Sequence, residues 1–161
     1  MHKAFISIGS NLGDKKGYCQ RALEWLGLLP NTVVKRISSY YLTEPVEERG
    51  QPWFINLVAM LETKLDCQSL FEWLKRGERV LGRFSTWPKG PRIIDMDLLL
   101  YDDCVLNTRR LVVPHPQLHK RSFVLVPLAE VAKRQRHPLF NKTIGCLLEE
   151  LKFKEWVIKI K

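Results

Sequence analysis

The hydrophobic residues recur with two different periods, and the order of these periods predicts a mixed fold of strands and helices. Short apolar or β-branched runs are typical of strands. Four such runs stand at 4–8, 33–42, 54–63 and 93–101. Helical spacing follows Asp14, and it returns in a second segment that either Asp66 or Ser69 can start. Pro30 and Gly82 end these two helices. The predicted order is therefore β-α-β-β-α-β.

The chain beyond residue 101 predicts a smaller set of elements. The stretch 105–113 is typical of a short hairpin, and 122–133 and 143–151 have the pattern of helices. Lysines alternate with Phe, Trp and Ile across 152–161, which indicates an edge strand or a tail. The β-α-β-β-α-β order matches the split unit of ferredoxin-like folds. We therefore predict an α+β fold, in which helices flank a ferredoxin-like antiparallel sheet and a helical extension follows at the C-terminal side.

Composition and charge narrow the class of protein. With 161 residues, 45% of them hydrophobic, the chain has the size of one domain, which we place at 1–161. No apolar run approaches the ~18 residues of a membrane span, and 1–9 lacks the regions of a signal peptide, so we expect a cytoplasmic protein with no membrane partner. Four separated cysteines form no C-x-x-C pair, so we expect reduced thiols and no structural zinc. The net charge of +9 favours polyanions, nucleic acid and nucleotide phosphates alike.

The strongest chemical signal is a pair of aspartates in an otherwise apolar strand. Asp95 and Asp97 lie two residues apart, so both carboxylates point to the same face of the strand. Their mutual repulsion and the cost of burying them are relieved by a divalent cation, and Mg²⁺ is usually held by carboxylates together with phosphate oxygens. The alternative is a pair of aspartates that form salt bridges with nearby Lys or Arg. Arg92, just before the pair, favours the metal because a guanidinium binds phosphate well.

A second signal is a cluster of basic residues between two prolines and a helix start, at 113–123. His115 and Arg121 are candidate phosphate ligands there. The spacing of His115 and His119 also occurs in zinc sites, but Pro116 interrupts a helix and no third ligand is evident. We therefore favour phosphate over zinc in this segment.

Two further segments carry weaker signals. Phe54 and Asn56 share a strand face, and an aromatic plane with a carboxamide suits a flat heterocycle that has donors and acceptors along its edge. Taken alone, Phe54 is more typical of a core and Asn56 of a strand edge. The segment 9–14, Gly-Ser-Asn-Leu-Gly-Asp, matches neither phosphate-binding loop pattern, so a turn with a helix cap is its favoured interpretation.

These segments together resemble one family, the 6-hydroxymethyl-7,8-dihydropterin pyrophosphokinases of folate synthesis. Order and spacing agree from residue 4 to about residue 132. The matching segments are 9–14, 39–45, 51–56, 82–83, 90–97, 114–116 and 121–128. The Arg-x-x-Asp-x-Asp segment is specific in combination with the later His-Pro and Arg-x-Phe segments, whereas none of them is specific alone.

The resemblance implies a reaction and a set of site residues. The β,γ-diphosphoryl group of ATP moves to the hydroxymethyl group of the pterin, which gives the pterin diphosphate and AMP. Two Mg²⁺ ions are expected between Asp95 and Asp97, and Arg83 and Arg92 are expected to assist catalysis. The positions that match ATP contacts are Glu78, Arg83, Arg92, Leu98, Arg110, His115 and Arg121. The positions that match the pterin pocket are Thr43, Val46, Phe54, Asn56 and Phe123, and the two phenylalanines would sandwich the ring. The partners are then small molecules, and we expect a monomer.

Two loops depart from the family pattern. Many relatives carry an Arg two residues after the Gly-Arg pair and a Trp or Asn just before Gly-Pro-Arg, where this chain has Ser85 and Lys89, with Trp87 nearby. Glu47 replaces a common glycine. Loops 43–53 and 84–90 are the expected lids of the site.

Two other classes of protein compete with the enzyme. An RNA-recognition domain shares the β-α-β-β-α-β order and a basic surface, but its aromatic strand motif is missing from 54–62. The aspartates at 95 and 97 would also repel a nucleic-acid backbone. An inactive relative that serves as an interaction domain is disfavoured because Arg92, Asp95, Asp97 and His115 are all present.

Overall fold

A computed structural model of the chain describes residues 1–46, 50–83, 90–152 and 154–160. The first part of the chain has the predicted alternation of strands and helices. Its elements are β1 (His2–Ser10), α1 (Lys15–Gly27), β2 (Thr32–Ile37), β3 (Tyr40–Thr43), β4 (Phe54–Thr63), α2 (Cys67–Val80) and β5 (Asp95–Tyr101). The expected lid positions Glu47, Ser85, Trp87 and Lys89 lie outside the described residues.

The second part contains two helices and several short strands. Its elements are β6 (Leu106–Asn107), β7 (Val112–Val113), the 3-10 helix η1 (Leu118–Lys120), α3 (Ser122–Ala132), β8 (Arg136–His137), β9 (Lys142–Thr143), α4 (Ile144–Glu150) and β10 (Val157–Ile160). The predicted hairpin is confirmed, because β6 and β7 pair. The lysine-rich tail forms an edge strand, because β10 pairs with β3. None of the helices in the described part of the chain is long and apolar enough to cross a bilayer.

One antiparallel sheet organises the molecule, with the strand order β10-β3-β4-β1-β5 and with β2 also paired to β4. The prediction of a single strand over 33–42 was wrong, because the chain forms two strands that pair with different parts of β4. The break lies at two serines whose polar groups bond outside the strand. Ser38 Oγ accepts from Val58 N at 2.9 Å, and Ser39 N donates to Glu130 Oε2 at 3.0 Å.

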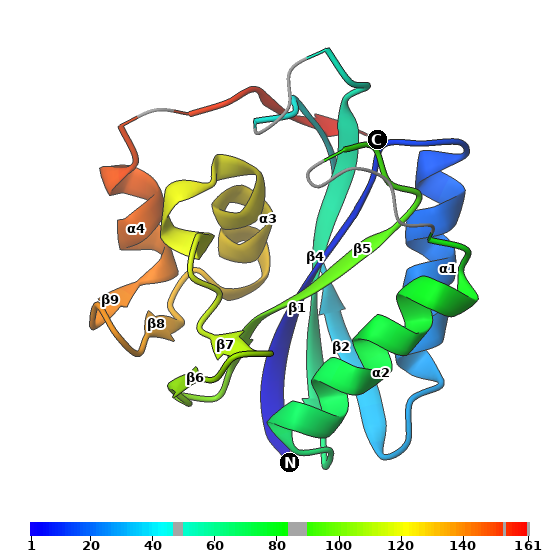
Figure 1. The fold of residues 1–161 in the computed structure, drawn as a ribbon. Helices are drawn as coiled ribbons and strands as arrows, with labels where there is room; N and C mark the ends of the chain where they lie inside the picture. The colour runs from blue at the N-terminus through cyan, green and yellow to red at the C-terminus, as the bar shows by residue number, and fades with distance from the viewer. Residues whose placement is uncertain (47–49, 84–89, 153, 161) are drawn as a thin grey trace.

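Helices cover both faces of the sheet, as Figure 1 shows: α1 and α2 on one side, α3 and α4 on the other. Each side has its own buried cluster, one containing Leu26 and Leu74, the other Leu125 and Leu128. Alternation over 95–99 of β5 follows the prediction, because Met96 and Leu98 pack in the α1–α2 cluster while Asp95, Asp97 and Leu99 line the pocket on the other face. The aspartates therefore lie on the α3 side of the sheet.

The helix starts follow from side-chain caps. Asp14 Oδ1 accepts from Gly17 N at 3.1 Å at the start of α1. Asp66, rather than Ser69, is the cap of α2, since its Oδ1 accepts from Ser69 N at 2.8 Å. Gly82 follows α2 with φ of +99°, a conformation that glycine adopts without strain and that ends the helix.

Candidate active site

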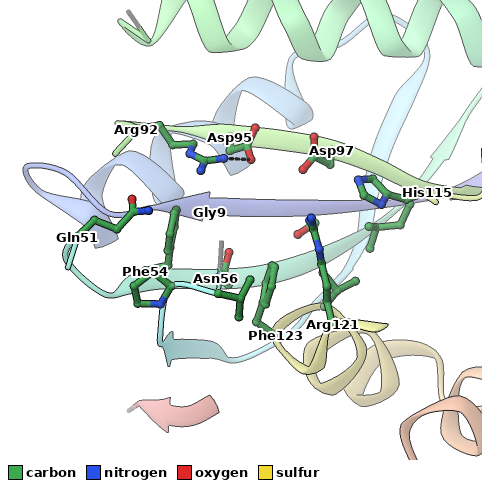
Figure 2. Close-up of a pocket in the computed structure, with 15 residues that line it drawn as sticks. Gly9, Gln51, Phe54, Asn56, Arg92, Asp95, Asp97, His115, Arg121 and Phe123 are labelled. Carbon is green, nitrogen blue, oxygen red and sulfur yellow. Dashed lines mark hydrogen bonds and ion pairs between the residues drawn. The ribbon is translucent and has the colours of Figure 1, made fainter. Parts of the chain in front are cut away.

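A pocket of about 630 Å³ opens at one end of the sheet and collects most of the residues that the sequence singled out. Figure 2 shows them converging from β1, β4, β5, the loop after β3 and the start of α3. The predicted residues that line it are Val46, Phe54, Asn56, Arg92, Asp95, Asp97, His115, Arg121 and Phe123. Segments distant in sequence therefore meet in one cavity.

Cations surround the two aspartates. Arg83 Nη1 lies 3.0 Å from Asp95 Oδ1, and Arg92 Nη1 lies 3.4 Å from Asp95 Oδ2. Lys75, from α2, places its Nζ 3.9 Å from Asp97 Oδ1. The two carboxylates thus form the salt bridges of the alternative interpretation, but they also remain on the wall of the pocket.

The two carboxyl groups titrate differently. Burial and then the charge of Asp95 raise the pKa of Asp97 to about 7. Burial also acts to raise the pKa of Asp95, but Arg83, Lys75 and Arg92 outweigh it and hold that pKa below its usual value. Asp97 therefore retains a proton more readily than an ordinary aspartate, because it is buried beside a second carboxylate.

These residues fit a magnesium ion. Two carboxylates on one strand face supply hard oxygen donors, and both line the pocket. Among the described residues no group of three or more His, Cys, Asp or Glu gathers as a metal cage. A pair of carboxylates completed by phosphate oxygens and water is how Mg²⁺ is usually bound beside a nucleotide.

Glu78 supports this wall from behind. Its side chain is only 5% exposed and its Oε2 accepts from Met96 N in β5 at 2.7 Å. The same carboxylate lies 3.2 Å from Arg83 Nη1 and 3.2 Å from Lys75 Nζ. Glu78 does not line the pocket. Burial places Glu78 where it holds the strand and two cations in position, and its contact with ATP stays a prediction.

A second network fixes Arg92. Asn11 Oδ1 accepts from Arg92 N at 2.8 Å, while Asn11 Nδ2 donates to Gln51 Oε1 at 2.7 Å and to Pro52 O at 3.1 Å. Asn11 is 1% exposed, so one buried carboxamide joins three segments of the site. The favoured interpretation of the segment 9–14 from local pattern was a turn with a helix cap. The signal that it missed is a polar residue directly after a buried strand.

The opposite wall is aromatic. Figure 2 shows Phe54 and Phe123 on either side of Asn56. Asn56 Nδ2 donates to Thr43 Oγ1 at 2.6 Å. Thr43 is 1% exposed and does not line the pocket; it orients Asn56, and its own contact with the pterin stays a prediction. Gly9, opposite Asn56 in the sheet, supplies the space that this carboxamide occupies.

Two basic side chains lie between the aspartates and the aromatic wall. The Arg121 guanidinium carbon is 5.5 Å from the centre of the Phe123 ring, and its charge acts to lower the pKa of Asp97. His115 is held by its backbone, because its N donates to Leu99 O at 2.9 Å. His119 packs its ring against Phe140 at 4.7 Å and does not line the pocket.

Leu98 and Arg110, like Glu78 and Arg83, are predicted ATP residues that do not line the pocket. The side chain of Leu98 is buried in the α1–α2 cluster, because it alternates with the aspartates along β5. The side chain of Leu98 therefore packs away from this pocket, and its position beside ATP stays a prediction. Arg110 extends from the β6–β7 hairpin to Glu72 of α2, with Nη2 2.8 Å from Oε1 and 67% of its side chain exposed.

The comparisons with known proteins agree on one family. The family model described as 7,8-dihydro-6-hydroxymethylpterin-pyrophosphokinase matches residues 5–133. A 2-amino-4-hydroxy-6-hydroxymethyldihydropteridine pyrophosphokinase of Methylorubrum extorquens is 39% identical over 132 residues, which cover 82% of this chain and 84% of the relative. The protein of that name in Bacillus subtilis is 37% identical over 81% of this chain and 78% of its own length.

Other similar proteins are much longer than this chain. The folic acid synthesis protein fol1 of Schizosaccharomyces pombe is 38% identical over 92% of this chain, but this chain spans only 20% of its length. A crystal structure of Plasmodium falciparum HPPK-DHPS superposes with a TM-score of 0.71 at 17% identity, covering 93% of this chain and 43% of that one. At that identity the superposition shows a shared fold.

Proposed function

The chain belongs to the 7,8-dihydro-6-hydroxymethylpterin-pyrophosphokinase family, and we propose that it transfers the β,γ-diphosphoryl group of ATP to the hydroxymethyl group of 6-hydroxymethyl-7,8-dihydropterin. The products are the pterin diphosphate and AMP, in folate synthesis. The observation that carries the proposal is the division of the pocket into a charged wall and an aromatic wall, which correspond to the two substrates. No observation favours the nucleic-acid-binding alternative.

The aromatic wall holds the pterin. Phe54 and Phe123 offer ring faces for stacking, and the Asn56 carboxamide recognises the donors and acceptors along the edge of the pterin. Val46 closes one side of this half of the site. Because Asn56 is itself held by Thr43, its orientation is set before the substrate arrives.

The charged wall holds the triphosphate. Arg92 and Arg121 bind phosphate oxygens with their forks of donors, and His115 adds a third contact. Arg83 approaches from behind Asp95 and adds to the positive charge. Arg110 extends the ATP site toward α2, and Leu98 contributes through its backbone. Asp95 and Asp97 would hold two Mg²⁺ ions, which, when bound, supply positive charge to the phosphate oxygens.

The residues then act mainly by positioning. The pterin hydroxymethyl oxygen forms a bond to the β-phosphorus, and the bond from that phosphorus to the α,β-bridging oxygen breaks, so that the oxygen leaves on AMP. Asp97 is the nearest carboxylate to take the hydroxyl proton. Arg92 and Arg121 stabilise the negative charge that develops on the transferred group.

The strand order of the sheet supports a ferredoxin-like core. If β2 and β3 are taken together as the second strand of the unit, the sheet order is second, third, first and fourth strand, as in a ferredoxin-like β-α-β-β-α-β core. The helices α3 and α4 then form the C-terminal helical extension. We propose one domain over 1–161, acting in the cytoplasm as a monomer on small molecules.

The test is an AMP-release assay with ATP, Mg²⁺ and 6-hydroxymethyl-7,8-dihydropterin, run beside Asp95→Ala. We expect pterin-dependent AMP release that the variant loses. A folded protein that binds MgATP but releases no AMP would have another acceptor. A folded protein that neither binds ATP nor releases AMP would overturn the proposal.

A further inference from the structure

The segment 154–160, called here the C-terminal strap, lies beside the pocket although it is distant from it in sequence. It lies outside the residues 5–133 that the family model matches. In Figure 1 it is drawn in red and leads into β10 at the edge of the sheet. Its sequence identified only an edge strand, so its place beside the site is a finding of the structure.

The strap is anchored first to the aromatic wall of the pocket. Val157 of β10 pairs with Thr43 of β3, the residue that holds Asn56. Just before β10, Trp156 N donates to Glu44 Oε1 at 2.9 Å, and Glu44 N donates to Trp156 O at 3.2 Å. Two residues after Glu44 along the chain, Val46 lines the pocket.

The second anchor lies at the start of α3. Ser122 Oγ donates to Glu155 Oε2 at 2.5 Å, and Ser122 is only 1% exposed. Ser122 stands between Arg121 and Phe123, and both of these line the pocket. The carboxylate of Glu155 therefore holds the turn of backbone from which one phosphate ligand and one aromatic side chain project.

Polar contacts, rather than apolar burial, hold the strap at this point. The Trp156 side chain is 67% exposed and Ile158 is 44% exposed. Between the strap and the loop after β3 lies an open hollow bordered by Glu155, Val46 and Gln51. Val46 and Gln51 also line the main pocket, so the strap borders the entrance on its aromatic side.

We propose that the C-terminal strap ties the two sides of the pterin half-site together, and that Glu155 is a positioning residue for pterin binding. Glu155 is hydrogen-bonded to Ser122, which precedes Phe123. The next two residues of the strap, Trp156 and Val157, bond to Glu44 and pair with Thr43, on the side of the pocket that holds Asn56. The strap sets the separation of these two sides. This inference rests on the proposed function, since it concerns the site that the pterin occupies.

The test compares the KM values of the two substrates in Glu155→Ala. A hydrogen bond to a charged group is worth roughly tenfold in an equilibrium constant, and part of this falls on the pterin site, so we expect the pterin KM to rise roughly three- to tenfold. The ATP KM and kcat should change less than the pterin KM, because Arg121 of the charged wall stands beside Ser122, whereas Arg92 is held by Asn11 and Asp97 faces Lys75 of α2. Glu155→Gln keeps an oxygen that accepts from Ser122 and should restore most of the wild-type KM. Glu149→Ala removes the same charge from an exposed position in α4 and should match the wild type.

Two results would overturn the proposal that the strap positions the pterin half-site. One is a Glu155→Ala protein with the pterin KM of the wild type. The other is a Glu155→Ala protein in which both KM values rise together with a lower unfolding temperature and no rescue by Gln, because that pattern indicates general loosening. A wild-type protein that releases no AMP would instead overturn the proposed function, so the two failures are distinguishable.

Discussion

Gly9 offers the sharpest test of how the sheet sets substrate recognition. It stands in β1 opposite Asn56 in β4. A Cβ added at Gly9 would lie 2.3 Å from Asn56 Oδ1 and 3.4 Å from Asn56 Cγ. Non-bonded carbon and oxygen atoms do not approach to 2.3 Å, so Gly9→Ala must displace the Asn56 carboxamide. The change adds one methyl group and removes no polar atom.

The size of the effect follows from what Asn56 does in the fold. It is 5% exposed and donates to Thr43 Oγ1 at 2.6 Å. Breaking that bond leaves buried polar groups unpaired, which costs about 1–3 kcal/mol of unfolding free energy. Sites that recognise a ligand by hydrogen bonds lose much of their affinity when one partner is misplaced. We therefore expect the pterin KM of Gly9→Ala to rise at least roughly tenfold, whereas the ATP KM changes by less than about twofold.

Initial rates of AMP release at varied pterin and at varied ATP measure both values, and urea unfolding measures stability. The matched control is Gly27→Ala at the end of α1, where nothing lies within 4 Å of the added Cβ. That control should leave both KM values unchanged and stabilise the fold by up to about 1 kcal/mol. A Gly9→Ala protein with wild-type pterin KM would refute the role given to Asn56.

Three further predictions address the charged wall and the α3 side. Asp97→Asn should lower kcat by roughly a hundredfold or more. It should also stabilise the metal-free protein above pH 7. The raised pKa of Asp97 means that the stability of the wild type falls as pH rises from about 4 to about 7, and Asn has no such proton to lose. Urea midpoints of the variant that are no higher than those of the wild type would contradict this. His137 is 2% exposed and burial lowers its pKa to about 4, so stability should fall by about 3 kcal/mol as pH drops from 6.5 to 4. If the stability of His137→Asn fell with pH as steeply as that of the wild type, the protonation of His137 would not be the cause. Arg110→Ala should change unfolding free energy by less than about 1 kcal/mol, because its ion pair with Glu72 is exposed, yet raise the ATP KM. An unchanged ATP KM would remove Arg110 from the site.

The parts of the site that sequence predicted best are those set by local periodicity. Alternation along β5 requires Asp95 and Asp97 to share one face, whatever the rest of the chain does. The same rule applied to β4 put Phe54 and Asn56 on one wall. The same rule also argued against a side-chain role for Leu98, since a residue next to Asp97 must point the other way. The resemblance supplied that position without saying which atoms act.

The parts that sequence missed depend on contacts between distant segments. Lys75 approaches Asp97 only because α2 packs beside β5. Asn11 binds Arg92, 81 residues away, and a turn residue in isolation gives no sign of such a contact. Glu78 has the spacing of an ordinary polar helix position, and only its burial against Met96 N reveals a supporting role. Pairings of this kind follow from the three-dimensional fold, which local pattern does not specify.

The placement of the supports explains how a small sheet can keep two unlike substrates apart. The charged wall is held by α2 through Lys75 and Glu78, whereas the aromatic wall is held by the tail through Glu155. Apart from Arg121, which belongs to the charged wall but stands next to Ser122, the two supports act on separate walls. A change in one wall should therefore alter one substrate constant at a time, as effects of distant and independent sites usually add. A double variant, Gly9→Ala with Arg110→Ala, should multiply the separate effects on the two KM values. A strong departure from that product would mean that the two walls move as one body.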